Sequence, residues 1–150
     1  MTQPVRLSVA LIPKGKSEES GPMDNNIRYE RGLAKLTEIY GDKGRLLLES
    51  LQEIAPDLGK YIVEFAFGDI HCRPGLTLKS REIATVAALT AMGTAEPQLR
   101  SHIHAALGAG CTEQEVVEII MQMALYAGFP AALNGIQAAK EVFLEQAQKK

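Results

Sequence analysis

The chain has 150 residues, of which 46% are hydrophobic and 23% are charged, and its formal net charge is −2 at pH 7. These values are typical of one globular domain. They argue against a general nucleic-acid-binding protein, which needs a basic face, and no apolar run is long enough to span a bilayer. The apolar stretch at residues 7–13 is too short for a secretory signal. We therefore expect a cytoplasmic protein without nucleic-acid or membrane partners.

Residues 1–24 are predicted to form an N-terminal arm, separate from a helical domain at residues 25–150. The arm is polar around four residues that break regular structure, namely Ser17, Ser20, Gly21 and Pro22. We expect it either to be disordered or to pack on a neighbouring subunit.

Three helices are predicted in the first half of the domain. They cover Arg28–Tyr40, Gly44–Ile54 and Leu58–Phe67. Their apolar residues recur at helical spacing, Gly41 and Pro56 end the first two helices, and Asp57 is the expected N-cap of the third. A turn is expected at Gly68–Leu76.

Four more helices are predicted in the second half. They cover Leu78–Met92, Ala95–Ala109, Thr112–Tyr126 and Ala131–Ala147. Thr94 is the expected N-cap of the second of these helices, and Thr112 and Glu115 form a T-x-x-E capping box that begins the third. No stretch has the alternation typical of a strand, so the predicted fold is an all-α bundle of about six to seven helices.

His102 and His104 lie two residues apart on one predicted helix, so they point to nearly opposite sides and cannot share a metal ion. No metal site is predicted. His102 lies beside the apolar stripe of its helix, whereas His104 is expected to face solvent. His102 is therefore the candidate catalytic histidine. The alternative is a histidine at the edge of the core that is paired by an ordinary hydrogen bond.

Glu82 lies near the start of the most apolar helix of the chain, in a region that we expect to contain little water. A carboxyl group in such a place is a candidate proton donor. The alternative is an acidic residue that is favoured in the first turn by the helix dipole.

The turn between the third and fourth helices collects polar residues, and loops between rigid helices often hold binding groups. Arg73 is a candidate for holding a substrate carboxylate, with an ordinary surface arginine as the alternative. Cys72 could act as a nucleophile only if a nearby positive charge lowered the pKa of its thiol, and we expect it to be structural. Tyr126 lies at a helix end before Gly128 and is a candidate for lining a pocket.

Six segments, in their order and spacing, resemble the carboxymuconolactone decarboxylase family over about residues 25–146. They are Arg28–Gly32, Arg73–Leu76, Lys79–Glu82, Leu99–Leu107, Gly110–Val116 and Tyr126–Ala132. The resemblance implies an AhpD-like helical fold and a homo-oligomer, a trimer or a hexamer, with sites near subunit contacts.

Relatives that reduce peroxides carry a CxxC followed by a histidine on one helix, with a glutamate on the helix before. The resemblance places that histidine on His102 and that glutamate on or next to Glu82. The two cysteine positions fall on Ala95 and Gln98, so peroxide reduction through this dithiol is excluded. No cofactor is expected.

The resemblance implies a decarboxylase for a small lactone or cyclic acid in aromatic-compound catabolism. In the family reaction the substrate supplies its own electron sink. Arg73 would hold a carboxylate, His102 or Tyr126 would stabilise the oxyanion, and His102 or a protonated Glu82 would deliver a proton. His71 is assigned to substrate binding.

Two positions depart from the family pattern, which usually has a tryptophan at position 71 and a small hydroxyl residue at position 82. Three alternatives follow. The first is another lyase, isomerase or hydratase of the same fold. The second is a helical oligomer without catalysis. The third is a thiol peroxidase that uses Cys72 and Cys111, which requires their sulfur atoms to be close together.

Overall fold

The computed structural model describes residues 22–148, which are all-α over that range. The elements are α1 (Pro22–Tyr40), α2 (Asp42–Leu51), α3 (Pro56–Tyr61), the π-helical segment η1 (Ile62–His71), α4 (Leu78–Met92), α5 (Glu96–Gly108), α6 (Glu113–Ala127) and α7 (Phe129–Ala147). The predicted all-α class is confirmed. No helix within residues 22–148 is long and apolar enough to cross a membrane. The predicted arm lies outside the described residues, except that residues 22–24 already belong to α1.

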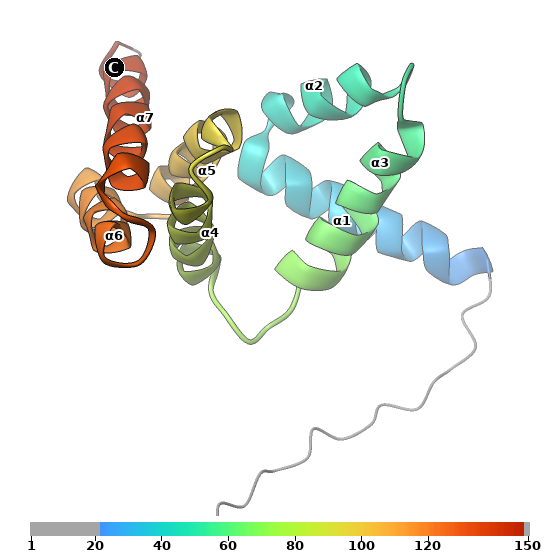
Figure 1. Cartoon of the computed structure of the whole chain (residues 1–150). Helices are drawn as coiled ribbons and strands as arrows, with labels where there is room; N and C mark the ends of the chain where they lie inside the picture. The colour runs from blue at the N-terminus through green and yellow to red at the C-terminus, as the bar shows by residue number, and fades with distance from the viewer. Residues whose placement is uncertain (1–21, 149–150) are drawn as a thin grey trace, which may run out of the picture.

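The helices form two groups, which lie side by side in Figure 1. The N-terminal unit consists of α1, α2, α3 and η1, and the C-terminal unit consists of α4 to α7. Each unit has its own core. The buried core residues of the N-terminal unit are Leu36, Leu48, Val63 and Phe67. The larger core of the C-terminal unit includes Val86, Ile103, Ile120 and Val142, each with 0% exposure.

Two helices of the C-terminal unit begin at side-chain caps. Oγ1 of Thr77 accepts a hydrogen bond from the backbone N of Ser80 at 3.1 Å, which starts α4. The capping box predicted at the start of α6 is confirmed, because Thr112 and Glu115 cap each other's backbone N–H groups at 3.1 and 2.8 Å. Lys79 bonds Glu115 at 2.8 Å and so ties α4 to α6.

Two of the predicted N-caps are wrong. Ala55 and Ala95 take the N-cap positions of α3 and α5, in place of Asp57 and Thr94, and neither helix has a side-chain cap. A proline lies in the first turn of each helix. Proline is favoured there because its missing N–H would have no partner inside the helix.

The turn predicted from Gly68 begins only after His71, because η1 continues the chain as a π-helix. The backbone N of Cys72 donates to the carbonyl of Phe67 at 3.2 Å, which is the wider π-type spacing. Gly68 does not end the helix but permits a close approach, since a Cβ there would lie 2.9 Å from the carbonyl oxygen of Arg28 on α1. The glycine therefore serves the packing of α1 on η1.

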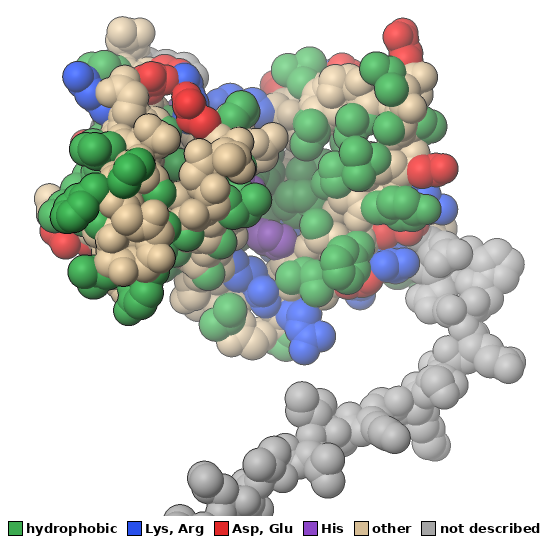
Figure 2. Space-filling model, viewed as in Figure 1, with side chains coloured by type: hydrophobic (Ala, Val, Ile, Leu, Met, Phe, Trp, Pro, Cys, Tyr) green, Lys and Arg blue, Asp and Glu red, His purple; other side chains and the backbone are tan. Residues whose placement is uncertain are grey.

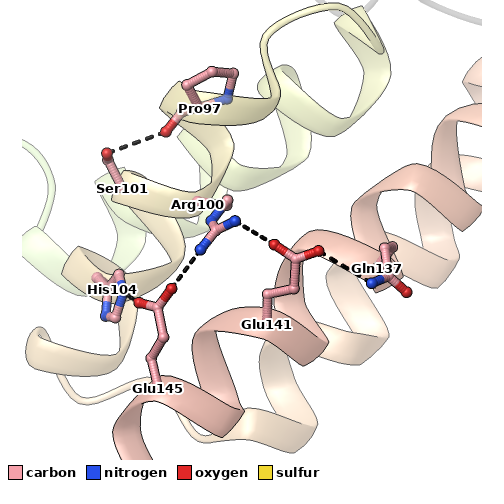
Figure 3. A network of polar contacts seen from close by, with 7 residues as sticks. All are labelled: Pro97, Arg100, Ser101, His104, Gln137, Glu141 and Glu145. Atoms are coloured by element: carbon pink, nitrogen blue, oxygen red, sulfur yellow. Dashed lines mark hydrogen bonds and ion pairs between the residues drawn. The ribbon is translucent and has the colours of Figure 1, made fainter.

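His104 lies against α7 rather than facing solvent, contrary to the expectation from the sequence. Its Nε2 is 3.0 Å from a carboxylate oxygen of Glu145, and 18% of its side chain is exposed. Arg100 pairs with both Glu145 and Glu141, so a polar network joins α5 to α7 (Figure 3). A pattern read from one helix does not reveal that another helix covers its polar side.

Candidate active site

Glu82 and His102 lie in contact on consecutive helices of the C-terminal unit. Oε2 of Glu82 is 2.9 Å from Nδ1 of His102. Glu82 has 0% exposure, whereas 23% of the His102 side chain is exposed. A buried carboxyl group that contacts a partly accessible imidazole is an arrangement suited to proton transfer. We call these two residues the Glu82–His102 pair.

Tyr40, the last residue of α1, brings the N-terminal unit to this pair. Its hydroxyl oxygen is 2.9 Å from Nδ1 and 3.2 Å from Nε2 of His102. When a proton on Nδ1 is directed at Glu82, the Tyr40 hydroxyl donates to Nε2. Burial, and then the nearby charge of Glu82, raise the pKa of Tyr40, so the phenol stays a neutral donor.

Sequence reasoning missed Tyr40. It precedes His102 by 62 residues, and its local pattern indicates only the end of a helix. Its edge-on contact with Phe67, at a centroid distance of 6.0 Å, fixes the ring against η1.

His71 is the last residue of η1, and its ring stacks on Phe67 at a centroid distance of 5.1 Å. Burial lowers the pKa of His71, and the charges of Arg81, His102 and Lys35 lower it further, whereas Glu82 opposes the shift. These charge effects arise from residues on α1, α4 and α5, so His71 lies where the two units meet.

The other two predicted substrate-binding residues have different surroundings. Arg73 is exposed, and its backbone carbonyl accepts a hydrogen bond from Nη2 of Arg81 at 2.8 Å. Tyr126, near the end of α6, is 77% exposed. Within residues 26–148, no hydrogen bond or ion pair joins either side chain to Glu82 or His102. Their roles in substrate binding stay predictions.

Three buried side-chain atoms in the described part of the chain have no hydrogen-bond partner. They are Nδ1 of His71, Nε of Arg81 and Oε1 of Glu82. Figure 2 shows a hollow between the two units with a histidine side chain at its floor and Lys and Arg side chains along one edge. The charges of Arg81 and Glu82 act on His71, so these three unpartnered atoms belong to residues that interact with one another.

Both cysteines are free thiols. Cys111 is 6% exposed and belongs to the core of the C-terminal unit, where burial raises the pKa of its thiol. Cys72 follows η1 in the connection to α4. A thiol peroxidase needs an accessible thiol of lowered pKa, so the environment of Cys111 argues against that alternative.

The model of the carboxymuconolactone decarboxylase family matches residues 56–141. The chain belongs to this family. The matched segment contains Glu82 and His102 but not Tyr40. The family resemblance inferred from the sequence is therefore confirmed.

Three proteins are similar in sequence to this chain, over aligned segments of different length. The 4-carboxymuconolactone decarboxylase of Acinetobacter baylyi is 38% identical over 122 residues, covering 81% of this chain and 90% of the relative. An uncharacterized protein of Paracoccus denitrificans is 35% identical over 100 residues, covering 66% and 75%. A nitrosuccinic acid decarboxylase of Metarhizium robertsii is 28% identical over 88 residues, covering 59% and 61%.

Proposed function

We propose that this protein is a cofactor-independent decarboxylase that acts on a small lactone or cyclic acid. The observation that carries the proposal is the contact of the fully buried Glu82 with His102 at 2.9 Å. Family membership and the decarboxylase names of two relatives support it. The same contact argues against a helical oligomer without catalysis. Burial of a carboxyl group that is not fully paired costs free energy, and such groups are concentrated at active sites.

The reaction requires the protein only to hold the substrate in position and to supply one proton. The bond between the carboxylate carbon and the substrate carbon breaks, carbon dioxide leaves, and the electron pair moves into a conjugated carbonyl group. A proton from the Glu82–His102 pair is then added to carbon, which restores the carbonyl. The neutral hydroxyl of Tyr40 holds the imidazole ring in place and keeps its tautomer fixed.

The test is an assay of the purified protein with 4-carboxymuconolactone, following loss of substrate absorbance and release of carbon dioxide. His102→Gln should lower turnover by about 10²–10⁴-fold, as for loss of a general acid. Ser101→Ala is the matched control, because Ser101 is exposed on the same helix and bonds only a backbone carbonyl. Full turnover by His102→Gln would remove the proposed mechanism.

A second candidate is a decarboxylase for a different acid. The two named relatives carry different substrates in their names, and His71 and Glu82 differ from the usual family pattern. Nitrosuccinic acid therefore belongs in the same assay. Release of carbon dioxide from it, with 4-carboxymuconolactone left intact, would favour this candidate.

We also propose that the protein is a homo-oligomer, a trimer or a hexamer. The end of α6 and the start of α7 expose a group of large apolar side chains, namely Leu125, Tyr126, Phe129 and Leu133, each at least 67% exposed. A second copy covering this surface would bring Tyr126 to a subunit contact. Analytical ultracentrifugation of the wild type and of Leu125→Glu tests this: the variant should dissociate, and a monomeric wild type would contradict the proposal.

A further inference from the structure

Four aromatic rings lie in series at the boundary between the two helical units. The rings of His102 and Tyr40 are in contact at a centroid distance of 5.7 Å and an interplanar angle of 90°. Tyr40 then contacts Phe67 at 6.0 Å and 88°, and Phe67 stacks on His71 at 5.1 Å and 23°. Perpendicular and stacked pairs at such distances are both favourable arrangements of aromatic rings. Phe67, which has no polar side-chain atom, thus lies between two polar rings.

Phe67 is held in the core of the N-terminal unit. It is 6% exposed and shares this core with Leu36, Leu48 and Val63. It lies within η1, where its backbone carbonyl accepts a hydrogen bond from the backbone N of Cys72 at 3.2 Å. Because side chains in a close-packed core occupy defined rotamers, the Phe67 ring is a fixed surface for its neighbours.

Tyr40 depends on such a surface because of its place in the chain. It is the last residue of α1, and Gly41 follows with a φ of 53°, so the chain leaves the helix directly after it. Among the described residues, His102 alone forms a hydrogen bond with the Tyr40 hydroxyl, whose oxygen is 2.9 Å from Nδ1 and 3.2 Å from Nε2. Since these distances are similar, a small rotation of the Tyr40 ring decides which nitrogen it bonds.

We propose that Phe67 is a positioning residue, whose ring holds the Tyr40 hydroxyl on Nε2 of His102 and so keeps the proton of Nδ1 directed at Glu82. The catalytic consequence rests on the proposed decarboxylase function, in which the Glu82–His102 pair supplies the proton. Phe67 acts through Tyr40. The His71 ring stacks on Phe67 and completes the series within η1.

The first measurement needs no turnover and follows the ring nitrogens of His102 by ¹⁵N NMR at a pH where the ring is neutral. The chain has 3 histidines, and His102→Gln identifies the signals of His102. We expect Phe67→Leu to move these signals in the same direction as Tyr40→Phe, since both weaken the same hydrogen bond. Phe67→Leu should add no further change when Tyr40→Phe is already present, because the two residues act through one interaction.

Leu48→Val is the matched control, because Leu48 belongs to the same core but packs beside Gly59 of α3. It should lower the melting temperature without moving the His102 signals. Phe67→Met keeps the apolar volume and serves as the test if Phe67→Leu does not fold. Unchanged His102 signals in the Phe67 variants would overturn the proposal. Equal changes from Phe67→Leu with and without Tyr40→Phe, or the same change from Leu48→Val, would also overturn it.

The second measurement is turnover in the decarboxylase assay. Phe67→Leu should lower kcat by about 2- to 10-fold, and by no more than Tyr40→Phe does, because at most one hydrogen bond is lost. The two proposals fail in different ways. A Tyr40-dependent change in the His102 signals, without decarboxylation by the wild type, removes the proposed function alone. A wild-type kcat in Phe67→Leu removes the positioning role alone.

Discussion

The hydroxyl oxygen of Tyr40 lies 2.9 Å from Nδ1 of His102, and these two residues belong to helical units with separate cores. The candidate site is therefore assembled across a boundary. One unit provides Glu82 and His102, and the other provides Tyr40 and His71.

Removal of the Tyr40 hydroxyl tests its role as a positioning residue. Tyr40→Phe keeps the ring contact with Phe67 but loses the hydrogen bond to His102, which is worth about 0.5–1.5 kcal/mol in general. We expect kcat to fall by about 3- to 10-fold with little change in KM, and the pH profile of kcat to shift. Tyr61→Phe, at an exposed tyrosine, is the control. An unchanged pH profile would leave Tyr40 with a purely structural role.

Two buried glutamates give a matched pair of variants. Glu82→Gln removes the charge but keeps the shape, so we expect turnover to fall by about 10²–10⁴-fold while the protein stays folded. Glu64 is 6% exposed and pairs with Arg28 and Lys60 in the N-terminal unit. Glu64→Gln should therefore lower the melting temperature with a much smaller effect on turnover. The idea fails if Glu82→Gln decarboxylates at the wild-type rate.

The lowered pKa of His71 predicts a loss of stability in acid. The neutral ring is favoured in the folded state, mainly because of burial, whereas the unfolded chain takes up a proton near pH 6.5. Stability linked to His71 is thus fully present above pH 6.5 and is lost as the pH falls toward the lower folded pKa. Urea unfolding at pH 7.5 and 5.5 should show a smaller acid loss for His71→Gln than for the wild type. A His71 ring that titrates above pH 6.5 by NMR contradicts this.

The crossing of α1 on η1 depends on Gly32. A Cβ at that position would lie 2.0 Å from the carbonyl oxygen of Val63, a backbone atom that cannot turn aside. Gly32→Ala should destabilise the protein by about 2–4 kcal/mol and displace the elements that carry Tyr40 and His71. Gly75→Ala is the control, because no atom lies within 4 Å of the Cβ position there. Equal melting temperatures for the two variants would show that the crossing tolerates a methyl group.

Local patterns predicted much of the C-terminal unit. The helix bounds Leu78–Met92 agree with α4, and the capping box at Thr112 needs only residues three apart. Glu82 and His102 were singled out because each polar side chain lies in an apolar stretch, and the structure brings them into contact. These features depend on residues that are close in sequence, and hydrophobic periodicity predicts structure over such short separations.

Other features depend on contacts between distant segments. Tyr40 reaches His102 only because the two units pack together, and the continuation of the chain through Gly68 as the π-helical segment η1 left no signal in the local pattern. Arg81 was passed over because it looks like an ordinary charged residue in the first turn of α4. Only the buried position of its Nε distinguishes it from a surface arginine.

The separate cores have a consequence for how the protein would lose activity. The chain passes from one core to the other through the short connection between η1 and α4. Slight separation of the two bodies, with every helix preserved, would withdraw the phenol from the imidazole and open the carboxyl group to water. Catalytic activity would then depend on the packing of the two units against each other. Heat or denaturant would therefore abolish activity before the helical content is lost.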